Sequence, residues 1–366
     1  MKSKVMICNS SYNDNSIKKS ISDIFEAFPR EWKGKKVLVK PNILAPRDLE
    51  KGITTHPEIV RAVVLQLKKE GAEVIVGDNP GVKGYGKVVE AAKITGIYDA
   101  SEGCFQNIAQ RPVAHKVASK YFESVSVSSE IFEADVIVNL PKMKTHGLTY
   151  ITGAIKNTFG YVTGGNKMLV HSLAPSPRKF SEAMLDIFSI RPPELSIMDA
   201  ITSMEGNGPA NGALRHPGKI LASDNAVSLD AVFLHMIKQK NAAVPIVDIA
   251  GQRGLGEIDV SKLDICGELT LLDNYKMPTT FVPGLMGLFL NRMLSTKISC
   301  LPVIDKHSCK VCGICINHCP VGAMTIKNDF PDVDKKECIK CYCCQEMCPD
   351  DAIKLEGRIL NMIRRT

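Results

Sequence analysis

The cysteines of this 366-residue chain constrain its fold more than any other feature, because nine of the 13 lie between Cys309 and Cys348. They form two copies of one pattern, C-x2-C-x2-C-x3-C-P, separated by 18 residues. The odd total in a large chain excludes a disulfide framework for the whole protein. The first residues also lack an apolar run of signal-peptide length, so we expect reduced thiols and a cytoplasmic protein.

This spacing is the ligand run of 4Fe–4S clusters, in which the fourth cysteine of each copy binds the other cluster. It predicts two 4Fe–4S clusters. The expected ligands of cluster one are Cys309, Cys312, Cys315 and Cys348, and those of cluster two are Cys338, Cys341, Cys344 and Cys319. A zinc site needs two or four cysteines with longer gaps between pairs, which this pattern does not have. Because no histidine replaces a cysteine ligand, the pattern favours low reduction potentials, about −400 mV.

Residues 300–356 resemble the bacterial two-cluster ferredoxin module, which is a pseudo-symmetric pair of short helices and hairpins. The resemblance implies single-electron transfer with a soluble donor or acceptor protein as partner. Cys343 departs from the pattern. It is either a small packed side chain beside Cys344, or an alternate ligand or redox-active thiol.

Short apolar, β-branched runs recur in the first 300 residues, and each ends in polar residues. They are residues 37–39, 74–76, 136–140, 195–198 and 219–222. Between the first two, residues 57–71 have apolar side chains at helical spacing and end in glycine. The alternation predicts an α/β body with a mostly parallel sheet covered by helices on both faces, followed by a small α+β ferredoxin-like domain.

The polar residues after these runs predict a site, because ligands of open parallel sheets bind beyond the carboxyl ends of the strands. Basic and amide side chains suit carboxylate or phosphate oxygens. The residues expected to bind an anionic substrate or cofactor are Lys40, Asn42, Lys142, Lys144, Thr145, Lys156, Asn157 and His171. The expected acid/base residues are His146, His56, Asp78, Asp199 and Glu205. Metal ligation by the acidic residues, His56 and His171 is the alternative.

Several other functions lack support in the sequence. The glycine loops match neither a dinucleotide fingerprint nor a Walker motif, and no Gly-x-Ser-x-Gly elbow is present. The net charge of +7 is dispersed and aromatics are only 6%, which argues against nucleic-acid binding. The most apolar stretch, residues 281–290, is too short to span a membrane. It is either a segment buried between domains or a surface for membrane or partner docking.

A second resemblance covers more than half of the chain, from about Val37 to Asp230. It is carried by the strings KPN at 40–42, PKMKTH at 141–146, TGAIKN at 152–157 and MEG at 204–206. These are similar to the "domain of unknown function 362" family, many members of which are fused to a two-cluster ferredoxin module. The resemblance implies an iron–sulfur protein of anaerobic metabolism and assigns no reaction.

The sequence therefore predicts three parts: an α/β body at 1–277 with its family-like core at 37–230, an apolar connection at 278–300, and a two-cluster domain with a basic tail at 301–366. The favoured function is a redox enzyme or reductase component that relays low-potential electrons to an anionic substrate or cofactor. The alternatives are an electron carrier whose body only docks or regulates, and an iron–sulfur scaffold or sensor.

Overall fold

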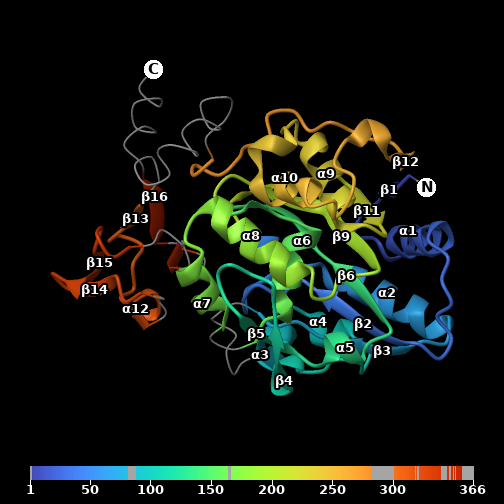
Figure 1. Ribbon diagram of the computed structural model, residues 1–366, viewed down its shortest axis with the longest axis horizontal. Helices are drawn as coiled ribbons and strands as arrows, with labels where there is room; N and C mark the ends of the chain where they lie inside the picture. The colour runs from blue at the N-terminus through green and yellow to red at the C-terminus, as the bar shows by residue number, and fades with distance from the viewer. Residues whose placement is uncertain are drawn as a thin grey trace.

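The computed structural model describes residues 2–80, 88–163, 166–281 and 301–317, together with 319, 321–338, 344, 345, 348, 350 and 352–356. Figure 1 shows a large body built on one twisted sheet and, beside it, a small C-terminal domain in orange and red. Most of the apolar stretch 281–290, Cys341, Cys343 and the basic tail 357–366 lie outside the described residues.

The main path of the body sheet joins seven strands. In spatial order they are β12 (Asp264–Gly267), β1 (Lys4–Asn9), β11 (Lys219–Ser223), β9 (Leu195–Glu205), β6 (Val136–Leu140), β2 (Lys36–Pro41) and β3 (Glu73–Val76). Along this path β11 runs antiparallel to both neighbours, and the other pairs are parallel. The prediction of a mostly parallel sheet is confirmed.

Each sheet face has its own hydrophobic core because side chains alternate along a strand. Val37 and Val39 face one core and Leu38 faces the other. The first core packs under α1 (Asp14–Ala27), α2 (Pro57–Lys69), α3 (Val88–Ile94) and α4 (Ile97–Ala100). The second packs under α6 (Ala154–Asn157), α8 (Pro177–Phe188), α9 (Ala226–Met236) and α10 (Pro245–Gln252). Helices therefore cover both faces, as the apolar runs predict.

The predicted helix at 57–71 is confirmed as α2, and its first residues show why it begins there. Pro57 occupies the first turn, where no backbone donor is needed, and the His56 side chain accepts from the Glu58 N–H at 3.3 Å. His56 is thereby held at the carboxyl edge of the sheet, where α2 starts.

The polar segment after residues 136–140, for which the sequence analysis assigned no conformation, is a buried strand, β7 (Lys142–His146). β9 is 11 residues long, and its second half extends beyond the other strands. There it pairs with β7 and with β10 (Ala213–Arg215), while β7 pairs with β8 (Tyr150–Thr152). A polar sequence becomes a strand here because β9 offers it a ladder of backbone partners.

The remaining elements of the body lie around this frame. They are the hairpin β4 (Pro112–Lys116) and β5 (Ser124–Ser128), the helices α5 (Glu130–Glu133) and α7 (Asn166–Leu173), and the 3-10 turn η4 (Thr158–Tyr161). No helix among the described residues has the length and apolar character needed to cross a membrane.

The C-terminal domain has internal pseudo-symmetry. β13 (Leu301–Ile304) pairs with β16 (Ile353–Glu356), β14 (Met324–Lys327) pairs with β15 (Phe330–Val333), and α12 spans Ile314–Asn317. The Asp305 N–H donates to the Ala352 carbonyl at 2.7 Å, and the Asp334 N–H donates to the Ala323 carbonyl at 2.8 Å. The two halves of the cysteine repeat thus fold alike and exchange contacts, as expected of a ferredoxin-like module.

Candidate functional site

Four cysteines from both copies of the repeat line one small cavity of the C-terminal domain. They are Cys309, Cys312, Cys315 and Cys348, and apolar side chains such as Ile304, Ile314 and Ile353 complete the lining. Cys315 and Cys348 are buried, whereas Cys312 is exposed. Thiolates around an apolar cavity match the donor set of a 4Fe–4S cluster, so the residues fit cluster one.

Two backbone N–H groups point at cysteine sulfurs in equivalent places. The Ala323 N–H donates to Cys319 Sγ and the Ala352 N–H donates to Cys348 Sγ, both at 3.2 Å. Hydrogen bonds of this kind stabilise thiolate charge. Of the expected ligands of cluster two, Cys319, Cys338 and Cys344 are described and Cys341 is not.

The second candidate site is the carboxyl edge of the body sheet, where a tight polar cluster forms around Asp199 of β9. Lys142 Nζ lies 2.7 Å from Asp199 Oδ2, and both side chains are buried. The Tyr12 hydroxyl donates to Asp199 Oδ1 at 2.9 Å and accepts from Lys142 Nζ at 2.8 Å. The His56 ring stacks on Tyr12, with centroids 3.7 Å apart. Tyr12 follows β1, and was not among the residues predicted from the sequence.

The electrostatics of this Tyr12–His56–Lys142–Asp199 cluster follow from burial. Burial lowers the pKa of Lys142, against the opposing effect of Asp199. Burial, and next the charge of Asp199, raises the pKa of Tyr12 far above its usual range. Burial also lowers the pKa of His56. The tyrosine therefore keeps its proton. Since Nδ1 of His56 accepts a backbone N–H, the neutral ring carries its proton on Nε2.

A second polar cluster adjoins the first through the loop after β2. Lys144 Nζ donates to Asn42 Oδ1 at 2.8 Å and to the Ile53 carbonyl at 2.5 Å. The Asn42 amide in turn donates to Asn157 Oδ1 at 2.9 Å. Nearby, the buried hydroxyls of Thr54 and Thr152 have no hydrogen-bond partner among the described residues. Thr152 is the register partner of Lys144 in the β7–β8 ladder, so these unpartnered hydroxyls occur on the same elements as this lysine and its partners.

A third cluster surrounds the end of β3. Lys40 Nζ lies 2.7 Å from Asp78 Oδ1, and both side chains are almost completely buried. A Cβ on Gly160 would lie 2.0 Å from Asp78 Oδ1, so only glycine permits this approach. Lys167 of α7 is also buried, and its ammonium group donates to the carbonyls of Asn79 and Pro80. Burial lowers the pKa of Lys167 to about 7.

Other predicted site residues have different surroundings. Nδ1 of His146 accepts from the Leu148 N–H at 3.0 Å, within a turn. The Thr145 hydroxyl donates to the Met204 carbonyl at 3.3 Å. Glu205 accepts from the Lys276 N–H at 3.1 Å and lies 3.5 Å from Arg215.

Lys156 and His171 lie together on the second sheet face. The His171 ring stacks on Phe180 at 4.3 Å, and Lys156 Nζ lies 6.0 Å from the centroid of the same ring. As for the alternative of metal ligation in the body, no three His, Cys, Asp or Glu side chains among its described residues group as ligands of a metal ion.

Asp230 of α9 was also missed by the sequence reasoning, and it fixes the helix that carries Asn157. Its carboxylate accepts the N–H groups of Ala154 at 2.6 Å and Ile155 at 3.0 Å, which begin α6. Burial raises the pKa of Asp230 from 3.8 to about 7, while the two N–H donors oppose this. A Cβ on Gly153 would lie 2.1 Å from Asp230 Oδ1, which accounts for the glycine in the TGAIKN string.

Because the pKa of Asp230 is raised by folding, the folded state binds more protons than the unfolded state between about pH 4 and pH 7. We therefore expect the contribution of Asp230 to stability to fall as pH rises through this window. Asn does not ionise, so the free energy of unfolding of Asp230→Asn, measured with urea, should rise relative to that of native protein as pH increases from about 4 to about 7. Exposed Asp224→Asn is the control. If the difference in unfolding free energy between Asp230→Asn and native protein does not change with pH, the raised pKa of Asp230 is contradicted.

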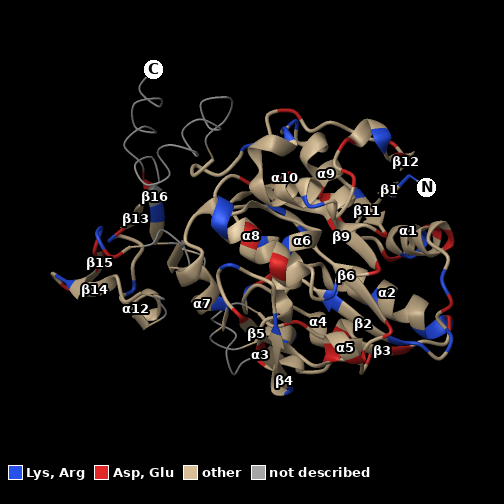
Figure 2. Ribbon diagram, viewed as in Figure 1, with Lys and Arg blue, Asp and Glu red and all other residues tan. Residues whose placement is uncertain are grey.

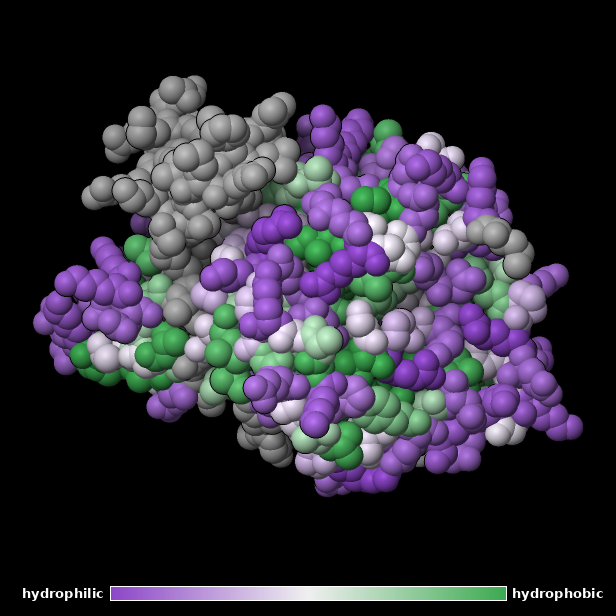
Figure 3. Space-filling view, viewed as in Figure 1, coloured by the Kyte–Doolittle hydropathy of each residue, from purple (hydrophilic) through white to green (hydrophobic). Residues whose placement is uncertain are grey.

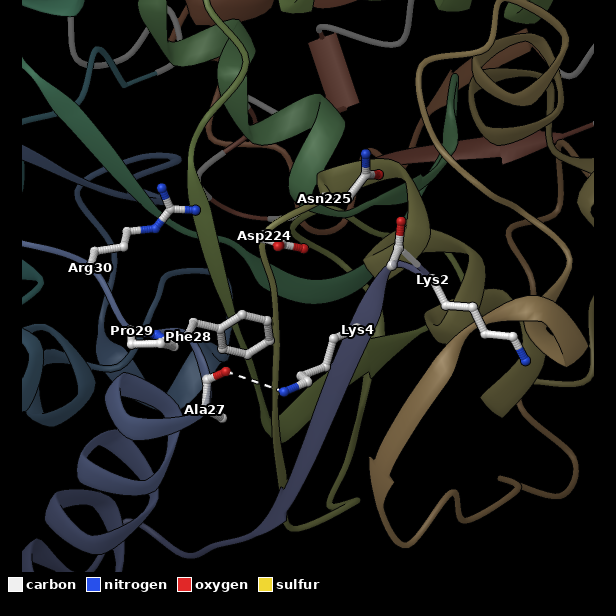
Figure 4. Close-up of a pocket in the computed structure, with 9 residues that line it drawn as sticks. Lys2, Lys4, Ala27, Phe28, Pro29, Arg30, Asp224 and Asn225 are labelled. Carbon is white, nitrogen blue, oxygen red and sulfur yellow. Dashed lines mark hydrogen bonds between the residues drawn. The ribbon is translucent and has the colours of Figure 1, made fainter.

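A cleft of about 470 Å³ lies at the opposite edge of the sheet, between the end of α1 and the start of α9. Figure 4 shows Lys4 turned toward Ala27, whose carbonyl accepts its ammonium group at 3.4 Å. Arg30 donates to the Glu194 carbonyl at 2.7 Å. Lys4 and Arg30 of this cleft thus have protein partners, and the cleft is separate from the carboxyl edge. Figure 2 shows basic and acidic residues interspersed over the visible face of the body, without a basic stripe.

The cavity, its cysteines and the repeated fold define the class: this is an iron–sulfur protein with a ferredoxin-type 4Fe–4S domain, a construction that supports electron transfer. The 4Fe-4S dicluster domain family matches residues 301–349. The chain belongs to the family described as Domain of unknown function (DUF362), which matches residues 37–235. Both resemblances seen in the sequence are confirmed.

Among curated proteins, a thylakoid-associated protein from Synechocystis sp. is 29% identical over 299 residues, covering 79% of this chain and 91% of that protein. Two solved structures are similar at a lower level. A Thermotoga maritima protein has 17% identity and a TM-score of 0.39, covering 69% of this chain and 59% of its own. The lactate racemase apoprotein from Thermoanaerobacterium thermosaccharolyticum has 12% identity and a TM-score of 0.43, covering 62% and 55%. This chain spans less than two thirds of either solved chain.

Proposed function

We propose that this protein is a redox enzyme or reductase component, in which two 4Fe–4S clusters relay low-potential electrons between a soluble partner protein and an anionic substrate or cofactor at the carboxyl edge of the body. The observation that carries the proposal is where the module contacts the body. The Arg47 side chain donates to the Cys348 carbonyl, and Gln345 donates to the Asn207 carbonyl at 3.5 Å. Arg47 follows β2 and Asn207 follows β9, so both contacts are at the edge that holds the polar clusters.

The loop that carries Arg47 also holds the proposed substrate site. Asn42 and the Ile53 carbonyl belong to this loop, and both accept from Lys144. The ammonium group of Lys144 suits a carboxylate or phosphate oxygen, and two hydroxyls without a partner among the described residues belong to its register partner Thr152 and to Thr54, which follows Ile53 in the chain. When bound, the clusters supply single electrons and no substrate chemistry of their own.

The Tyr12–His56–Lys142–Asp199 cluster is assigned to orient the substrate during proton uptake. His56 is half-buried and neutral, so its Nε2–H is suited to donate a hydrogen bond to a substrate oxygen, while the proton that a reduced substrate takes up comes from solvent. Asp199 accepts the His56 backbone N–H at 2.9 Å and the Tyr12 hydroxyl, which holds both rings in place. Lys40 and Asp78 neutralise each other and are assigned a supporting role.

The soluble partner is expected at the outer side of cluster one. Cys312 is exposed, and its apolar neighbour Val311 is 42% exposed, so apolar surface lies next to a cluster ligand. Figure 3 shows further apolar surface along the lower edge of the module. A thinly covered cluster edge beside apolar surface suits a transient electron-transfer contact.

The proposal is tested with the full chain, loaded with clusters and reduced anaerobically by dithionite. We expect at least one member of a panel of carboxylates, phosphate esters and acyl thioesters to reoxidise the clusters, followed by visible absorbance. Lys144→Met should slow this reaction at least tenfold, because it removes the cation that binds the anion. Exposed Lys179→Met is the matched control. Equal rates for Lys144→Met and native protein would contradict the site assignment.

An electron carrier with a docking body is the second candidate, and one observation favours it. Lys40 and Lys142 are already ion-paired within the protein, so their charges are not available to a ligand. If the reduced protein passes electrons to an acceptor protein such as a soluble ferredoxin but to no small molecule of the panel, the result supports the electron carrier.

A further inference from the structure

The module is pseudo-symmetric, but its contact with the body is not. Cys348 and Cys319 are the equivalent crossing cysteines of the two clusters. The Cys348 carbonyl accepts from the guanidinium group of Arg47, a body residue. The Cys319 carbonyl accepts from the Gly322 N–H at 3.2 Å, within its own loop. Among the described residues, the body therefore places a cation against the backbone of Cys348, whereas the contact described for the Cys319 carbonyl comes from the module itself.

A guanidinium group stays ionised at any physiological pH, so Arg47 brings a permanent positive charge to the backbone of a cluster-one ligand. Adding an electron makes a cluster more negative, and a nearby cation favours that state. The charged residues that line the cavity of cluster one are Lys310 and Asp350, and their charges are opposite; Arg47 reaches the cluster ligand from outside this lining, through the Cys348 carbonyl. Arg47 is half-buried, so water screens it less than a surface arginine.

We propose that Arg47 raises the reduction potential of cluster one above that of cluster two, so that cluster one holds the electron that the module exchanges with the body. The inference identifies the exit point of the relay, and in that respect it rests on the proposed function. The potential difference itself depends only on cluster loading and on the contact between Arg47 and Cys348.

The test is an EPR-monitored redox titration of the full holoprotein with dithionite as one-electron donor. Cys312→Ser and Cys338→Ser, each altering one ligand of one cluster, assign the two signals. In the native protein we expect cluster one to be reduced first. Reduction of cluster two first would overturn the proposal, whatever the variants of Arg47 do.

Arg47→Gln removes the charge and keeps an N–H donor. At a fixed potential it should lower the ratio of reduced to oxidised cluster one about tenfold, which is about 59 mV for a one-electron couple. Cluster two should be unchanged, and Arg47→Lys should stay within about threefold of the native ratio because it keeps a charge. Arg30→Gln is the matched control, since Arg30 also donates to a main-chain carbonyl, that of Glu194 at the opposite edge.

Unchanged potentials in Arg47→Gln, or equal shifts of both clusters, would contradict the proposal. Iron and labile-sulfide content shows whether Arg47→Gln carries both clusters. If it does not, the order of cluster reduction in the native protein decides for or against the proposal. The redox titration contains no substrate, so its failure does not bear on the proposed substrate site. Failure of the substrate panel, in turn, does not bear on which cluster is reduced first.

Discussion

A Cys309→Ala/Cys348→Ala double variant should keep one unaltered 4Fe–4S cluster and about four iron atoms per chain, whereas Cys309→Ala/Cys319→Ala should keep no unaltered cluster. The reason is the cavity in which Cys309 and Cys348 lie together, although 38 residues of chain separate them. Removing both takes two ligands from one cluster and leaves the other complete. Removing Cys309 and Cys319 takes one ligand from each.

The measurement is iron and labile sulfide per chain, with EPR of the reduced protein to count unaltered clusters. Ligation within each copy of the repeat would give the mirror image, with one cluster spared in Cys309→Ala/Cys319→Ala. The matched control is Cys104→Ala/Cys266→Ala, two thiols of the body, which should keep about eight iron atoms. A control that loses iron would place a cluster ligand outside the module.

The 4Fe–4S domain was accessible to sequence reasoning because the chemistry of its expected cysteine ligands is local. Each loop needs three thiolates at fixed spacing, and the spacing is visible in the chain. The body sheet was accessible for a similar reason. A parallel strand buried on both faces is apolar along most of its length, and β2 and β6 contain the continuous apolar runs 37–39 and 136–138.

The strand β7 was not accessible in this way, since Lys142, Lys144 and His146 are poor strand residues by local preference. Its conformation comes from the overhanging half of β9, a tertiary contact. The candidate site was also only partly accessible. The rule that ligands bind at strand ends named Lys142 and Asp199 as separate candidates, but it did not predict that they form an ion pair.

Tyr12 was missed, although a signal existed. The run Val5–Cys8 is apolar and ends in polar residues, like the other strands that were used to locate the site. Applying the strand-end rule to the first strand would have brought Tyr12 into the list. Asp230 had no such signal, because it acts from the middle of a helix on the N–H groups of another.

Lys142→Met should destabilise the body by about 3–5 kcal/mol, because it leaves the carboxylate of Asp199 buried without its cation. Asp199 accepts four hydrogen-bond donors, and Lys142 is the charged one among them. The double variant Lys142→Met/Asp199→Leu should cost less than the sum of its single changes, since it removes both charges together. Urea unfolding followed by Trp32 fluorescence measures this, because Trp32 is the chain's only tryptophan and is buried in the body.

The matched control is Lys18→Met, which breaks an ion pair of similar length, 2.6 Å, in which both side chains are more than half exposed. Water screens that pair, so its loss should shift unfolding far less. If Lys142→Met costs no more than Lys18→Met, Asp199 does not depend on Lys142 for compensation of its buried charge, and the case for chemistry at Asp199 weakens. If Lys142→Met lowers the free energy of unfolding strongly while both clusters remain loaded, the stability of the buried ionic cluster in the body does not depend on the module. Proteins place such clusters at working sites more often than where packing alone is required.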